Sequence, residues 1–92
     1  MEKRIMKNWI KLERARHDIT QQQLADLAGV SVQTINSIEK YRYYPSTEVA
    51  LILSLVFKKT VNELFILEED EIKKVKMIEG EKDGKTPGRK LK

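Results

Sequence analysis

Apolar side chains recur every three or four residues along much of the chain, as they do on one face of an α-helix. Near the start this spacing occurs among lysines and arginines, and it predicts a helix over residues 6–17. The side chains expected to face inward from this helix are Met6, Trp9, Ile10 and Ala15. The pattern favours a helical fold from its first element onward.

Two short helices joined by a glycine are the next expected elements. Thr20 is placed to cap a helix over residues 21–28, because its hydroxyl can accept a hydrogen bond from a backbone amide of the first turn. Gly29 suits the end of that helix, since a residue without a β-carbon enters the left-handed region at little cost. Ser31 is a second cap and opens a helix over residues 32–40. Two helices with so short a connection form a helix-turn-helix.

The side chains between these two helices have the sizes that a close crossing requires. Ala25 is the small residue at the expected crossing point, and a larger side chain there would push the helices apart. The apolar residues expected around it are Leu24, Ala28, Val30, Ile35 and Ile38. Because helical bundles that bind no nucleic acid also contain such pairs, the spacing alone leaves DNA binding open.

Two more helices complete the patterned part of the chain. The run TEVALILSLVF, residues 47–57, is the most apolar stretch, and it predicts a helix that Ser46 can cap. Thr60 and Glu63 have the spacing of a capping box, in which each side chain bonds the backbone amide of the other residue. This box predicts a short helix that ends near residues 65–66.

Residues 68–78 are rich in charge and allow two interpretations. Ile72, Val75 and Ile78, here called the apolar stripe, are spaced by three and indicate an amphipathic helix. Val75 and Met77 alternate with lysines, which indicates a short edge strand. We favour the helix.

The end of the chain, residues 79–92, has the composition of a disordered tail. It contains three of the four glycines, one of the two prolines and no aromatic residue, so it cannot bury enough apolar area to offset the entropy of ordering. A chain of 92 residues is long enough for one domain. We therefore expect a helix-turn-helix domain over residues 1–67 and a charged, partly disordered C-terminal extension over residues 68–92.

The cysteine and histidine counts exclude several kinds of chemical site. The chain has no cysteine and one histidine, which removes disulfide frameworks, thiolate nucleophiles and nearly every zinc-binding pattern. His17 lies on a polar corner with acidic neighbours (Glu13, Asp18 and Asp26), but the sequence has no second histidine to complete a metal or acid-base site. We expect neither an enzyme nor a metal, a cofactor or a small-molecule ligand.

Charge and hydropathy bear on where the protein acts and what it binds. No signal peptide is visible and no run reaches the roughly 18 apolar residues of a membrane-spanning helix, so we expect a cytoplasmic protein without a membrane partner. The net charge of +4 permits a polyanionic partner without demanding one. Residues 1–67 hold 10 Lys and Arg against 7 Asp and Glu, and residues 68–92 hold 8 against 7. The excess positive charge is therefore mostly in the expected domain.

The outward face of the helix over residues 32–40 carries short or amide-bearing side chains, where solvated helices more often have glutamate and lysine. Glutamine bonds bidentately to adenine N6 and N7, hydroxyls bond either base type, and valine or threonine methyls contact the thymine methyl. This composition favours the reading of base edges. The residues expected to contact bases are Val32, Gln33, Thr34, Asn36 and Ser37.

Polar groups on either side of that helix are candidates for contact with the DNA backbone. Gln21 would direct its amide at a phosphate, together with free backbone N–H groups and the helix dipole; a solvated helix start is the alternative. Cations and hydroxyl-tipped rings after residue 39 would grip the backbone beside the groove, whereas Tyr44 could equally serve packing. The expected phosphate contacts are Gln21, Gln22, Lys40, Tyr41, Arg42 and Tyr43.

The segment RARHDITQQQLADLAGVSVQTINSIEKYRYYPS carries a family resemblance. It is similar to the pattern L-T-Q-x-x-L-A-x-x-x-G-V-[ST]-R-Q-T-I-x-x-I-E-x-x-x-Y-x-P-S of small stand-alone regulators in the phage-repressor and Cro class, the XRE-like family. The resemblance covers residues 5–67. It implies an all-α, five-helix bundle like the lambda repressor domain, which binds operator DNA as a homodimer with its third helix in the major groove.

The resemblance also implies roles for single residues. By the matching positions Gln21 takes the phosphate role and Gln33 and Ser37 face bases, as does Val32. An ion pair between Arg14 and Glu39 is implied as well, tying the first helix to the end of the third. If this pair is partly buried, removing one partner would strand the other charge.

Two sites depart from the family pattern. Val32 stands where the pattern has arginine, so a thymine methyl is a better expected partner there than guanine. Ile52 and Leu55 stand where relatives commonly carry exposed lysines, three residues apart on one helix face. They either widen the core or form an interface with a second subunit or with the apolar stripe.

We expect a sequence-specific, double-stranded DNA-binding transcriptional regulator that acts as a repressor, since a short chain most simply acts by occupying an operator that overlaps a promoter. One alternative is the antitoxin of a toxin–antitoxin pair, which would use residues 68–92 to wrap a toxin partner. Another is an adaptor that bridges proteins without reading bases.

Overall fold

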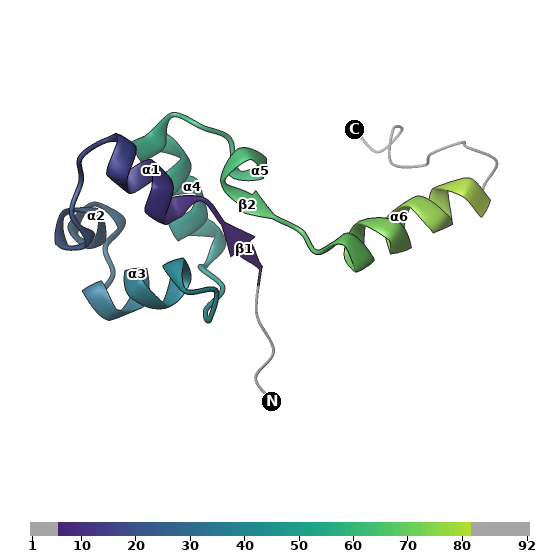
Figure 1. Ribbon diagram of the computed structural model, residues 1–92, viewed down its shortest axis with the longest axis horizontal. Coiled ribbons are helices and arrows are strands. Elements are labelled where there is room, and N and C mark those ends of the chain that lie inside the picture. The colour runs from purple at the N-terminus through teal and green to yellow at the C-terminus, as the bar shows by residue number, and fades with distance from the viewer. Residues whose placement is uncertain (1–5, 82–92) are drawn as a thin grey trace.

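The structure is a computed structural model that describes residues 6–81, with side chains described as far as Ile78. Across these residues the chain forms six helices and one pair of short strands. In chain order they are β1 (Lys7–Asn8), α1 (Ile10–Arg16), α2 (Gln21–Ala28), α3 (Val32–Glu39), α4 (Thr47–Phe57), α5 (Val61–Leu64), β2 (Phe65–Ile66) and α6 (Glu69–Glu81). Helices α1 to α5 gather into a bundle, and α6 extends away from it (Figure 1). The expected all-α class is confirmed.

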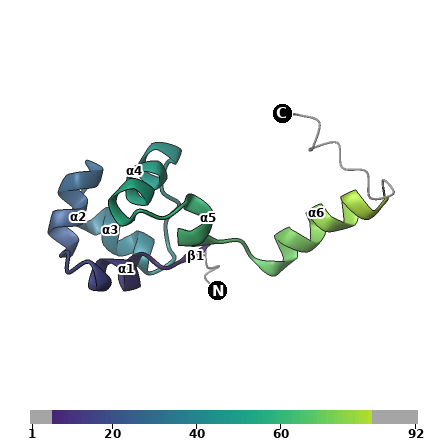
Figure 2. The ribbon, with the colours of Figure 1, turned by 90° about the horizontal axis from the view of Figure 1, so that it is seen from above.

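One apolar core holds the bundle together. Its buried members are Ile10, Leu24, Ala25, Ala28, Ile35, Ile38, Leu53, Phe57, Leu64 and Phe65. Helix α2 packs on both α3 and α4, while α3 also contacts α1 and α4 contacts α5. The view from above shows the same grouping, with the five helices at one end of the molecule and α6 at the other (Figure 2).

The start of the chain differs from the helix expected over residues 6–17. Residues Lys7–Asn8 form a strand that pairs antiparallel with Phe65–Ile66, and α1 begins only at Ile10. Asn8 explains the difference because its buried side chain bonds in two directions. Its Nδ2 donates to the Ile38 carbonyl at 2.8 Å, and its Oδ1 accepts from the Ile10 N–H at 3.0 Å. The partner strand likewise ends the predicted last helix of the bundle one or two residues early.

The late start of α1 also corrects the predicted inward face. Ile10 is fully buried as expected and Met6 packs partly against the core. Trp9, however, is 48% exposed and Ala15 is also exposed, because both lie off the face that a helix starting at residue 10 turns inward. That face carries Glu13, which is buried.

The predicted helix caps are confirmed. Thr20 and Thr60 each form a capping box, the second with Glu63 as expected. Ser31 accepts from the Thr34 N–H and Ser46 from the Val49 N–H, both at 3.1 Å. Each cap satisfies an amide that the first turn of a helix leaves without a partner. Local signals of this kind fix the starts of α2, α3, α4 and α5.

The helix that we favoured for residues 68–78 is present as α6, and the strand alternative is wrong. The helix continues over residues 79–81, which we had assigned to a disordered tail. Once a helix has formed, each further residue adds a backbone hydrogen bond without a new nucleation cost, so a helix can run a few residues past its apolar pattern. The remainder of the expected tail, residues 82–92, lies outside the described residues. Among residues 6–81 no helix combines the length and apolarity needed to cross a bilayer.

Candidate nucleic-acid interface

The crossing of α2 and α3 has the geometry predicted for a helix-turn-helix. Ala25, Ile35 and Ile38 are fully buried between the helices, and Val30 packs against their edge. Gly29 ends α2 with φ of 74°, and its N–H donates to the Ala25 carbonyl at 2.8 Å. The wedge therefore holds α3 at a set angle, with its other face turned to solvent.

The polar side chains on the outer side of α3 differ in how far they are exposed to solvent. Gln33 is exposed, whereas Asn36 and Ser37 are partly buried. Thr34 is partly buried too, and its hydroxyl lies 3.0 Å from that of Ser31 in the helix cap. Val32 packs against the edge of the core. All five predicted base contacts thus lie on one helix, with Gln33 the most accessible.

The residues predicted to contact phosphates lie at the start of α2 and after α3. Gln22 is exposed, and its amide donates to Asp26 at 2.9 Å. Four side chains that follow α3 are exposed: Lys40, Arg42, Tyr43 and Tyr44. Tyr41 is partly buried and has a left-handed backbone, with φ of 62°. The exposure of Tyr44, at 60%, disfavours the packing role considered for it.

Gln21 departs from the expected geometry. Its side-chain nitrogen turns to α3, where it donates to Glu39 Oε1 at 3.1 Å and to Asn36 Oδ1 at 3.3 Å. The amide is engaged within the protein rather than directed outward. Because the Thr20 cap takes the Gln23 N–H, the backbone N–H groups of Gln21 and Gln22 are the remaining first-turn donors for a phosphate at this end.

Arg14 and Glu39 form the ion pair that the resemblance implied. Arg14 Nε lies 2.7 Å from Glu39 Oε2 and Nη2 lies 3.3 Å from Oε1, which makes a two-pronged contact. A third nitrogen donates to the Ile19 carbonyl at 3.1 Å. The side chains are 19% and 4% exposed, respectively. The pair ties α1 and the α1–α2 turn to the C-terminal end of α3.

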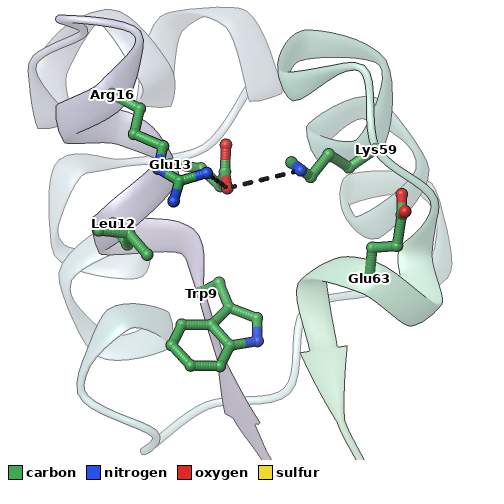
Figure 3. A pocket seen from close by; sticks show the side chains of 6 residues that line it. All are labelled: Trp9, Leu12, Glu13, Arg16, Lys59 and Glu63. Atoms are coloured by element: carbon green, nitrogen blue, oxygen red, sulfur yellow. Dashed lines mark hydrogen bonds and ion pairs between the residues drawn. The ribbon is translucent and has the colours of Figure 1, made fainter.

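A second charge cluster lies in a hollow on the other side of α1, and the sequence did not predict it. Glu13 is 4% exposed, and its Oε2 lies 3.4 Å from Arg16 and 4.0 Å from Lys59. Figure 3 shows both cations approaching the same carboxylate oxygen, with Trp9 below. Oε1 lies 3.8 Å from His17, whose ring packs on Phe57.

This hollow has the character of a structural cluster. The remaining residues that line it, beside those just named, are Leu12 and Glu63. Among the side chains of residues 6–78, no group of three or more His, Cys, Asp or Glu is placed to hold a metal ion. Two residues missed by sequence reasoning, Asn8 and Glu13, therefore serve the fold. Asn8 had a usable signal, since it is a cap-type residue two positions before the first helical residue.

The two apolar residues flagged on α4 have different surroundings. Ile52 is partly buried and packs against the core, so it widens the core as one alternative proposed. Leu55 is 76% exposed. The apolar stripe lies on α6, which points away from α4 in both views (Figures 1 and 2), so the stripe does not cover Leu55 within the chain.

Two crossed helices with a glycine turn, an uncharged polar face on the second and cations after its end define a DNA-binding domain of the helix-turn-helix class. The family model described as Helix-turn-helix matches residues 10–64, the span of α1 to α5. The chain belongs to this family, and within it to the Cro and repressor type.

Curated relatives point the same way. A transcriptional regulator of the helix-turn-helix type from Methanocaldococcus jannaschii is 46% identical over 66 residues, which are 72% of this chain and all of the relative. One from Archaeoglobus fulgidus is 37% identical over 67 residues, 73% of this chain and 94% of the relative. The regulator YgzD of Bacillus subtilis is 40% identical over 65 residues, 71% of this chain and 98% of the relative.

Family membership makes the protein a DNA-binding transcriptional regulator rather than an enzyme. The family match ends at residue 64, so α6 lies beyond it. Because the M. jannaschii relative is matched over its whole length, the remaining 28% of this chain has no counterpart there.

Proposed function

We propose that the protein is a sequence-specific repressor that inserts α3 into the major groove of operator DNA as a homodimer. The observation that carries the proposal is the outer face of α3, where uncharged hydrogen-bonding side chains are held outward by a fully buried wedge. A rigid helix can place its side chains against base edges with the accuracy that base readout needs.

The charge around α3 supports the same proposal. Lys40 and Arg42 are exposed directly after the helix, and Tyr43 adds a hydroxyl. Cations at this position neutralise phosphates beside the groove and fix the register of the helix without carrying sequence information. Gln22 and Tyr41 complete the proposed backbone contacts, together with the first-turn amides beside Gln21.

The family match, over residues 10–64, supports a division of the chain into two parts with separate roles. Residues 1–67 form the DNA-binding domain, and residues 68–92 form an extension with a separate role. Exposed Leu55 on α4 is the proposed centre of the dimer interface. A dimer would bring two copies of α3 to half-sites about 34 Å apart on one face of the duplex. A cytoplasmic location follows, since operator DNA is in the cytoplasm of bacteria and archaea such as those of the relatives.

Selection from a random duplex pool tests this function. We expect the full chain to enrich one motif with two-fold symmetry, whereas a protein that bridges others without base readout would enrich none. Gln33→Ala should then weaken binding to the selected site by about 1–3 kcal/mol and leave binding to random DNA unchanged. Asn62→Ala, an exposed amide on α5, is the matched control. Equal weakening on both kinds of DNA would contradict base readout.

One observation favours a second candidate function. The amphipathic helix α6 extends away from the bundle with Val75, Met77 and Ile78 each more than half exposed. Such a helix suits a protein partner, as in an antitoxin that binds its toxin. If this candidate holds, a small toxin encoded beside this gene is neutralised by the full chain, and Val75→Lys with Ile78→Lys abolishes neutralisation without changing DNA affinity.

A further inference from the structure

A continuous chain of side-chain contacts runs from α1 through α3 to α2 and back to the DNA-facing side of α3. It begins at Arg14, passes through Glu39 and Gln21, and ends at Asn36. Each link is a hydrogen bond whose direction is set by chemistry, so the order of donors and acceptors along it can be worked out.

The direction starts with the charged pair. Glu39 is 4% exposed and accepts two hydrogen bonds from Arg14, so its carboxylate is held in place. An ionised carboxylate can only accept. The group of Gln21 that lies 3.1 Å from Glu39 must therefore be the amide nitrogen, and the reversed amide would set two acceptors against each other.

The same reasoning determines how the side-chain amide of Asn36 is oriented. The Gln21 nitrogen carries two hydrogens, one for Glu39 and one for the atom of Asn36 that lies 3.3 Å away. That atom must be an acceptor, which is the carbonyl oxygen Oδ1 of Asn36. The NH₂ group of Asn36 is then on the other arm of its planar amide, pointing away from the Gln21 nitrogen. Asn36 thus offers DNA donors and keeps its acceptor occupied.

We propose that this chain of hydrogen bonds from Arg14 to Asn36, here called the relay, leaves Asn36 able only to donate hydrogen bonds to a base. It would therefore select guanine over adenine at the base pair it faces. A free asparagine bonds adenine bidentately, donating to N7 and accepting from N6. With its oxygen held by Gln21, Asn36 cannot accept from N6. Guanine presents two neighbouring acceptors, O6 and N7, which match two donated hydrogens. The inference rests on the proposed function, since it requires α3 to lie in the major groove.

The experiment is a binding selection from a random duplex pool with the full chain and four variants. Asn36→Ala identifies the base pair in question as the one whose preference it removes. The wild-type chain is expected to prefer guanine to adenine there by about tenfold. Gln21→Met keeps the length of the side chain and removes its donors, which frees Asn36 to turn. We expect the preference at that base pair to shift toward adenine by about tenfold.

Two further variants separate the relay from general effects. Gln22→Met makes the same change at the next residue, outside the relay, and should alter affinity without altering any base preference. Asn36→Asp keeps an oxygen facing Gln21 but replaces the NH₂ group by a second acceptor. It should replace guanine by cytosine, whose N4 amino group donates. This variant leaves Gln21 in place and so tests the donor role even if Gln21→Met is poorly folded.

The outcomes are distinct. The proposed role of Asn36 is wrong if the wild-type chain prefers adenine at the base pair that Asn36→Ala identifies. It is also wrong if Gln21→Met or Asn36→Asp still prefers guanine at that base pair. The same holds if Asn36→Ala changes no preference while the motif itself persists. A wild-type pool that enriches no motif would instead overturn the proposed function on which the relay depends.

Discussion

A single residue contributes most to this bundle where there is no space for a larger side chain, or where its side chain bonds several helices at once. Ala25 lies fully buried at the crossing of α2 and α3, and its size sets how closely the helices approach. Glu39 accepts from Arg14 and from Gln21 and so joins three helices through one carboxylate. The first role was expected from side-chain size, while the contact of Glu39 with Gln21 was not. A side chain's size can be read from the sequence, but its hydrogen-bond partners depend on neighbours that the fold supplies.

Ala25→Leu should lower the free energy of unfolding by about 1–3 kcal/mol, because the larger side chain overpacks the crossing and forces the helices apart. Urea unfolding followed by circular dichroism measures this. Ala15→Leu places the same change on the exposed side of α1, where we expect an effect within about 0.5 kcal/mol. Similar losses in both variants would mean that the crossing is not tightly packed.

Glu39→Gln should cost about 3 kcal/mol of unfolding free energy, since it leaves the guanidinium of Arg14 without its counter-charge in a largely buried site. We take the lower end of the usual range because Arg14 is 19% exposed. The control is Glu71→Gln on α6, whose contact with Lys74 is exposed and 3.9 Å long. That change is expected to cost no more than about 0.5 kcal/mol. A small loss at both sites would show that the buried pair contributes little.

At the scale of elements, helix ends follow local rules and strand pairing does not. The helix caps could be predicted from the sequence because each cap bonds a backbone amide only three residues away. They are Thr20, Ser31, Ser46 and Thr60. The β1–β2 pair places Lys7 opposite Ile66, and the sequence of neither short strand predicts which segment it will pair with. The helix ends also use the left-handed region, at Gly29 and at three residues with side chains: Asp18, Tyr41 and Lys58.

Two substitutions at helix ends should have opposite signs. Gly29→Ala should destabilise by about 1 kcal/mol through backbone strain alone, because φ is 74° and an added β-carbon meets nothing within 4 Å. Lys58→Gly, where φ is 57°, relieves the same strain at the end of α4. After the entropy cost of glycine, a gain of about 0.5 kcal/mol remains. Thermal unfolding of both variants checks the pair, and changes of equal sign would contradict the explanation.

At the scale of the whole molecule, a family-sized bundle carries an added helix. Helices α1 to α5 match the family model, and α6 projects from the end of β2 without covering the exposed part of α4 (Figure 1). Sequence reasoning grouped Ile52, Leu55 and the apolar stripe as one possible interface. The structure separates them, because Ile52 joins the core, Leu55 faces solvent and the stripe lies elsewhere.

Leu55→Lys is expected to convert the proposed dimer into single chains of 10.8 kDa, because it places a charge at the centre of an apolar contact between copies. Light scattering after size exclusion measures the mass. The helical signal in circular dichroism should persist, since Leu55 is 76% exposed and adds little to the core. Leu27→Lys, at 56% exposure on α2, is the matched control and should leave the mass unchanged. A Leu55→Lys variant that keeps twice the chain mass would place the interface elsewhere.

The sequence alone determined the helix-turn-helix, its caps and the residue types on the outer face of α3, because hydrophobic periodicity and capping act within a few residues of one segment. The class of protein came from the family resemblance of one segment of the sequence, because helix pairs with the same periodicity and caps also occur in bundles that bind no DNA. Only the tertiary structure decided that Asn8 bridges α1 and α3, that Glu13 is buried and that Gln21 turns inward to Asn36 and Glu39. These features join residues as many as 30 positions apart, so their partners exist only once the helices have packed.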